Sequence, residues 1–162
     1  MQIGTIFEAK ANAPHVVISD TEILGSRSRK ELPVLTSGVI CLGLTSNDLS
    51  LAYLNDPRRS LLRIEAVDGD LGFRPKNRGL FLDTPERSFG VCIRTTFTKE
   101  VRQSSYIFFC AGIGIRGTIA TAQYLANSWP ELSRRTGKKD FVAVISVSTN
   151  EGRPDLEGVY TA

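Results

Sequence analysis

The stretch SYIFFCAGIGIRGTIATAQYLANSW, residues 105–129, decides which fold is expected for this chain. Ser105–Ala111 is apolar without alternation, which indicates a strand that is buried on both faces, as in the centre of a parallel sheet. Apolar residues then return at helical spacing over 118–129, and a second uninterrupted apolar run follows at 141–148. The sequence therefore predicts a strand, a glycine-rich turn, a helix and a second buried strand between residues 105 and 148.

Weaker patterns extend this unit in both directions along the chain. Apolar runs, alternation and turn residues set the boundaries of the further elements. We expect strands at 15–19, 38–42, 62–66, 79–83 and 89–94, helices at 21–32 and 47–55, a turn at 68–72, and a second short helix that begins near Pro130 and ends near Gly137. The middle of the chain is expected to be antiparallel or to lie at a sheet edge.

The predicted fold class is α/β: a Rossmann-like three-layer sandwich, with a mostly parallel central sheet and some antiparallel edge strands. Strand–helix–strand crossovers produce this arrangement, because the helices cover the faces of a buried parallel sheet. The chain has 162 residues, of which 41% are hydrophobic and 23% charged, as in an ordinary globular protein. That length suits one hydrophobic core, so we expect residues 1–162 to form a single Rossmann-like domain.

Composition narrows the classes of function. The formal net charge is only +3, from 20 basic and 17 acidic residues, so a nucleic-acid partner is not expected. Three cysteines in separate apolar runs and the one histidine, His15, provide neither a disulfide framework nor a zinc site. We expect no metal, although a site made of carboxylates alone stays open.

The sequence also gives an expectation for the cellular location of the protein. The N-terminal residues lack the hydrophobic region of a signal peptide. The apolar stretches are too short to span a membrane. We therefore expect a cytoplasmic protein that has no membrane partner.

The turn between the predicted strand and helix carries the main chemical signal. Gly112, Gly114 and Gly117 have the Gly-x-Gly-x-x-Gly spacing between a strand and a helix, which is the context that phosphate binding requires. The start of a helix offers unpaired N–H groups and a partial positive charge to an anion, and Arg116 and Thr118 add a charge and a hydroxyl. The alternative is that the three glycines only make a tight turn between closely packed elements.

Three further residues are candidates for the same site. Asp20 and Glu22 follow the predicted strand at 15–19, where ligands of open α/β sheets bind, so either carboxylate could act as nucleophile or base. Asp20 could equally cap the following helix. Arg94 ends the predicted strand at 89–94, where it would reach either a ligand or a surface carboxylate.

Residues Tyr106–Thr118 and the helix after them resemble Rossmann-type nucleotide-binding modules of bacterial sensor or effector proteins. The glycine–threonine pair that enters the helix is also similar to that of nucleotide-processing Rossmannoids, which cleave N-glycosidic bonds. The resemblance implies a nucleotide-, nucleoside- or NAD-related ligand over the glycine turn and, in an enzyme, hydrolysis or transfer at an N-glycosidic bond by Asp20 or Glu22. The alternative is a non-catalytic sensor or protein-interaction domain within a larger protein. A homo-oligomer is compatible with either function.

Overall fold

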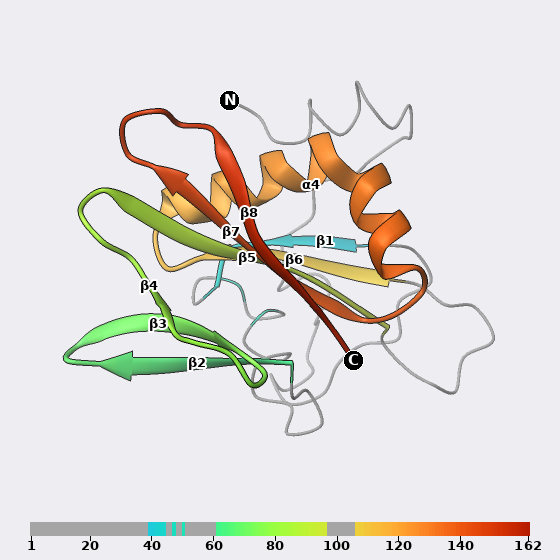
Figure 1. The fold of residues 1–162 in the computed structure, drawn as a ribbon, viewed down its shortest axis with the longest axis horizontal. Helices are drawn as coiled ribbons and strands as arrows, with labels where there is room; N and C mark the ends of the chain where they lie inside the picture. Colours follow the sequence, from blue (N-terminus) through green and yellow to red (C-terminus); the bar gives the residue numbers. More distant parts are fainter. Residues whose placement is uncertain (1–38, 45–46, 48–49, 51–60, 97–105) are drawn as a thin grey trace.

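The computed structural model describes residues 39–44, 47, 50, 61–96 and 106–162. Eight strands and one long helix lie in these segments (Figure 1). In chain order they are β1 (Val39–Leu42), β2 (Leu62–Val67), β3 (Asp70–Pro75), β4 (Phe81–Leu82), β5 (Arg87–Thr96), β6 (Tyr106–Gly112), α4 (Ile115–Thr136), β7 (Phe141–Ser148) and β8 (Pro154–Thr161).

Five of the strands form one mixed sheet in the order β1-β6-β5-β7-β8. The pair β1–β6 is parallel, whereas β5 is antiparallel to both β6 and β7, and β8 is antiparallel to β7. Because both are antiparallel to β5, β6 and β7 point the same way but lie on either side of it. The helix α4 connects them and crosses the intervening strand, as in a split β-α-β unit.

Both faces of the central strands are buried. Side chains of β5, β6 and β7 pack against α4 on one face and against the small sheet β2-β3-β4 on the other. The α4-facing cluster contains Cys92, Cys110, Ala122, Leu125, Leu132, Phe141, Ala143 and Ile145, and the opposite cluster includes Phe73, Val91, Ile93, Ile107, Phe109, Ala111, Val142 and Val144. The five-stranded sheet is therefore the middle layer of the described residues.

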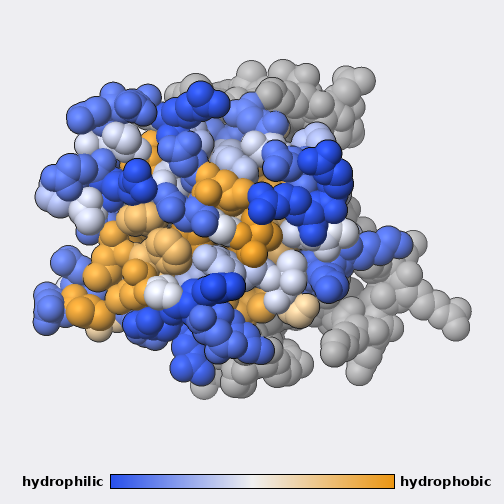
Figure 2. Space-filling view, in the orientation of Figure 1, coloured by the Kyte–Doolittle hydropathy of each residue, from blue (hydrophilic) through white to orange (hydrophobic). Residues whose placement is uncertain are grey.

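The small sheet is built around a tight hairpin. Its strands β2 and β3 are antiparallel and are joined by Asp68 and Gly69, whose φ angles are 53° and 92°. Two consecutive positive φ angles are typical of the type I′ turn, for which Asp-Gly is a favoured pair. Figure 2 shows apolar side chains gathered over this sheet, and Val67 and Leu71 beside the turn are 38% and 36% exposed.

The helix α4 has one buried and one exposed side. Ala120, Thr121 and Leu125 are buried against the sheet. Pro130 lies inside the helix, and Figure 1 shows that α4 is not straight, as expected of a helix with an internal proline. The helix ends at Gly137, whose N–H donates a hydrogen bond to the Ser133 carbonyl oxygen at 2.8 Å. Within the described residues, no helix combines the length and apolar character that are needed to cross a membrane.

The predicted fold class is wrong. About half of the described residues are in strands, with one long helix, and only one of the four strand pairs in the large sheet is parallel. This is neither a Rossmann-like α/β sandwich nor a mostly parallel sheet. The error has a physical reason, because burial on both faces does not specify strand direction. The small antiparallel sheet covers the second face of the central strands, where helices were predicted.

Individual elements differ from the prediction as well. The apolar run predicted at 105–111 corresponds to β6 from Tyr106 onward, and that at 141–148 is β7, with the helix between them. That helix continues through Pro130, so the proline does not begin a second helix. Strands β3 and β8 were not predicted, and the expected turn at 68–72 contains only the hairpin turn and the start of β3. The elements predicted at 15–19 and 21–32, and most of that at 47–55, lie outside the described residues.

The helix approaches β5 through two glycines that face each other. A Cβ atom on Gly117 would lie 2.2 Å from the Phe89 carbonyl oxygen, and one on Gly90 would lie 2.4 Å from the Gly117 carbonyl oxygen. Both separations are far shorter than van der Waals contact, and the atoms that would clash belong to the backbone. Only glycine at both positions allows α4 to lie this close to the sheet.

Replacing Gly117 with alanine is expected to destabilise the protein strongly, because the new methyl group must push α4 away from β5. We expect a loss of about 1–3 kcal/mol or more in the free energy of unfolding, measured by denaturant titration. Gly79→Ala is the matched control, since a Cβ atom there would lie more than 4 Å from the other atoms that the structure describes. Equal stability of the two variants would contradict the close helix–sheet contact.

Candidate functional site

The glycine turn lies where β6 ends and α4 begins, and it is held by its own hydrogen bonds. The Gly112 N–H donates to the Thr118 hydroxyl oxygen at 2.9 Å, and the Thr118 hydroxyl faces the Gly114 carbonyl oxygen at 3.4 Å. The Thr118 N–H also donates to the Gly114 carbonyl oxygen, at 3.2 Å. Thr118 therefore closes the turn, and its hydroxyl would have to release the Gly114 carbonyl oxygen before it could donate to a ligand.

The three glycines of the motif have different surroundings. A Cβ atom on Gly112 would lie 2.4 Å from the Thr118 nitrogen, so this glycine is required by the first turn of the helix that follows it. Gly117 is required by the contact with β5. Gly114 is different, because a Cβ atom there would meet no atom of the described residues within 4 Å, and its φ of −112° suits any residue. Packing explains two of the glycines but not the third.

The first turn of α4 lacks the groups that usually neutralise the start of a helix. Gly114 is the N-cap residue, and no side chain caps the helix there. The first turn contains no acidic residue, while Arg116 within it is exposed. The first N–H groups of any α-helix have no partner within the helix and carry partial positive charge. These N–H groups, the exposed guanidinium and the open space at Gly114 lie together at one end of α4.

Arg94, in contrast, lies at the opposite end of the helix. It is opposite Phe108 and Phe141 in the sheet, and its Nη2 donates to the Gly137 carbonyl oxygen at 2.7 Å and to that of Lys139. A helix of the length of α4 spans roughly 33 Å from end to end. From the sequence, Arg94 and the glycine turn were candidates for the same site. The structure places them at opposite ends of α4.

Arg94 instead stabilises the C-terminal end of α4. Only 2% of the residue is exposed, and its guanidinium lies 4.9 Å from the Tyr106 ring centroid, 5.0 Å from that of Phe141 and 5.7 Å from that of Trp129. Burial lowers the pKa of Arg94 from its ordinary value, and the charges of Tyr106 and Asp140 oppose that shift. A positive charge beside the last carbonyls of a helix is favourable.

The two predicted catalytic carboxylates, Asp20 and Glu22, lie outside the described residues. Their role stays a prediction. Within the part of the chain that the structure describes, no three His, Cys, Asp or Glu residues form a group that could hold a metal ion. The described part of the site thus consists of the turn and Arg116.

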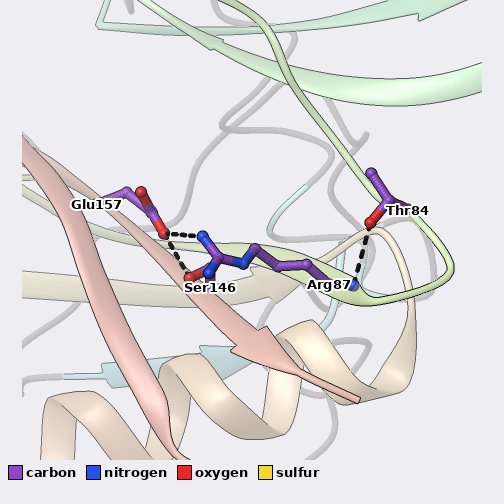
Figure 3. A network of polar contacts seen from close by, with 4 residues as sticks. All are labelled: Thr84, Arg87, Ser146 and Glu157. Carbon is purple, nitrogen blue, oxygen red and sulfur yellow. Dashed lines mark hydrogen bonds and ion pairs between the residues drawn. The ribbon is translucent and has the colours of Figure 1, made fainter. Parts of the chain in front are cut away.

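Sequence reasoning missed a polar network that joins β5, β7 and β8 (Figure 3). Glu157 accepts hydrogen bonds from Arg87 Nη1 at 3.1 Å and from the buried Ser146 hydroxyl at 2.5 Å. The Arg87 N–H also donates to the Thr84 hydroxyl oxygen at 3.1 Å. Because strand side chains alternate, Arg87 lies on the sheet face opposite Gly90 and α4. The network therefore holds the edge strand in place and is separate from the glycine turn.

No family model matches the chain, and comparison with curated proteins and with solved structures finds no match. The resemblance of Tyr106–Thr118 to nucleotide-binding modules thus stays a prediction. Support for a function comes from the geometry and charge of the turn.

Replacing Arg94 with alanine is expected to lower the free energy of unfolding by about 2–4 kcal/mol, because the change removes ring packing and leaves the Gly137 and Lys139 carbonyls after α4 without this donor. Binding at the glycine turn should not change. Denaturant titration measures the first effect, with Arg153→Ala as the control because Arg153 is exposed. A loss below about 0.5 kcal/mol would mean that Arg94 does not stabilise the end of α4.

Proposed function

We propose that the N-terminal end of α4 binds a small phosphate-bearing molecule through the backbone N–H groups of its first turn. The main support comes from Gly114, because neither packing among the described residues nor backbone conformation requires glycine there. A side chain at this position would extend into the space in front of the helix N-terminus. Glycine keeps that space free, so an anion can come close to the N–H groups.

The electrostatics of the first turn support the same ligand. A helix start is stabilised by Asp, Asn, Ser or Thr at the N-cap and by acidic residues in the first turn. Here the N-cap is glycine, no acidic residue follows in the first turn, and Arg116 places a positive charge there instead. The first turn itself therefore does not neutralise the partial positive charge of α4, which favours binding of an external anion.

The non-phosphate part of the ligand would meet apolar surface. Ile115 is 77% exposed and Ile119, one helical turn further along, is 38% exposed. Exposed isoleucines beside an anion site favour an organic phosphate over the inorganic ion, because an organic group can cover them. Nucleotides belong to this class of ligand. The fold is not Rossmann-like, however, so it gives no separate support for a nucleotide. The proposal covers binding, and catalysis by Asp20 or Glu22 stays a separate prediction.

A thermal-shift screen tests the proposal, with inorganic phosphate, AMP, ADP, ATP, NAD and ADP-ribose as the probes. A ligand at about 100 times its dissociation constant stabilises the folded state by roughly 2.7 kcal/mol, which is readily measured. We expect at least one organic phosphate to raise the melting temperature more than inorganic phosphate does. If none of the probes raises the melting temperature, the proposal is contradicted.

Two substitutions at Gly114 separate binding from folding. Gly114→Asp and Gly114→Asn should both cap α4 and raise the stability of the ligand-free protein by a few tenths of a kcal/mol or more. The aspartate should also weaken binding of the ligand by roughly tenfold or more, because its charge faces the phosphate. The uncharged asparagine should weaken binding less. Isothermal titration of both variants with the ligand found in the screen would show the difference, and equal affinities would place the site elsewhere.

A further inference from the structure

Two of the three cysteines face each other across neighbouring strands. Cys92 of β5 is the direct partner of Cys110 of β6 in the antiparallel register. Both side chains lie on the face that α4 covers, and both residues are fully buried. Cys41 lies elsewhere, in the cluster on the opposite face of the sheet, where its register partner is Phe109.

The backbone hydrogen bonds show which kind of cross-strand pair this is. The Cys110 carbonyl oxygen accepts a hydrogen bond at 3.0 Å from the N–H of Gly43, which follows β1. In a strand, the N–H and C=O of one residue point to the same side, so Cys110 directs both groups toward β1 and away from β5. Cys92 and Cys110 therefore form a non-hydrogen-bonded pair, in which opposite Cα atoms are about 4.5 Å apart and side chains are closest.

This geometry suits a disulfide. Disulfides join residues whose Cα atoms are about 4.4–6.8 Å apart, a range that includes a non-hydrogen-bonded antiparallel pair. The two side chains are register partners within the same buried cluster, and side chains are closest in this kind of pair. Bond formation would therefore require movement of the sulfur atoms and little displacement of the two backbones.

We propose that Cys92 and Cys110 form an oxidisable dithiol, in which a small two-electron thiol oxidant creates a cross-strand disulfide that links β5 to β6. Each thiol loses one proton and one electron as the S–S bond forms. With an azodicarboxamide such as diamide, the two protons and two electrons pass to the N=N bond and give a hydrazine. A glutathione disulfide would instead accept them as two molecules of thiol. The proposal is independent of any ligand at the glycine turn.

Burial controls how the pair reacts. The pKa of the Cys110 thiol is raised well above its ordinary value, first by the hydrogen bond to Cys92 and then by burial. Since the thiolate is the reactive form, the Cys110 thiol should react slowly with alkylating reagents. In addition, both thiols lie in the cluster that α4 covers, which should exclude bulky reagents. Ala122 and Leu125 of α4 belong to the same cluster, so the oxidant has to be small or to enter when the helix moves.

The test uses the native chain, treated with diamide under non-denaturing conditions at low protein concentration. The oxidant is then removed, and the protein is denatured and alkylated. Peptide mapping by mass spectrometry should find one intramolecular link between Cys92 and Cys110, with a mass lower by two hydrogen atoms, and an alkylated Cys41. Dithiothreitol should restore three alkylatable thiols. Three alkylated cysteines after diamide treatment, or a link that involves Cys41, would overturn the proposal.

Two serine variants provide matched controls. Cys41→Ser should retain the intramolecular link, because it leaves the facing pair intact. Cys92→Ser should lose it and keep two alkylatable thiols. If Cys92→Ser does not fold, the result on the native chain still decides the question. An intramolecular link between Cys41 and Cys110 in a folded Cys92→Ser protein would show that the register pair is not what directs oxidation.

Discussion

The close backbone contact between α4 and the five-stranded sheet is the constraint on which the rest of the structure depends. Gly90 and Gly117 bring the helix against β5, where any Cβ atom would collide with the backbone. This contact fixes the height of the helix above the sheet and buries the side chains beneath it, which include Cys92 and Cys110. It also fixes where the helix begins, and thus where its first N–H groups point. The small antiparallel sheet covers the other face, so the central strands are buried without a second layer of helices.

The same contact changes how the glycine motif is interpreted. Of its three glycines, Gly112 and Gly117 are explained by the tight joining of strand, turn and helix. For these two, the alternative of a tight turn between closely packed elements is sufficient. Gly114 alone is left for the phosphate hypothesis. The sequence could place the turn at the start of a helix, but it could not separate the three glycines, because that requires knowing which backbone lies against each. It could not place Arg94 either, since a residue that ends an apolar run can lie at either end of the neighbouring helix.

The strand–helix–strand order was predictable because β6 and β7 are long apolar runs on either side of an amphipathic helix. The position of β5 between them was not, since an inserted antiparallel strand leaves the apolar pattern of its neighbours unchanged. Pro130 was misleading because proline favours the first turn of a helix, yet here it is tolerated inside one. β8 was missed because it begins with Pro154 and contains Gly158, and both residue types are uncommon inside strands. Glu157 lies in β8, so its polar network could not be predicted either.

The most direct test of the central claim is to observe the first turn of α4 while a ligand binds. Two-dimensional NMR of the nitrogen-15-labelled protein, titrated with an organic phosphate such as ATP, reports on each backbone N–H group separately. The account predicts saturable shifts of the Ile115, Arg116 and Gly117 signals, while those of Gly69 in the β2–β3 turn and Gly137 at the far end of α4 stay in place. Unchanged signals at the first turn throughout the titration, or shifts centred on another part of the molecule, would contradict it.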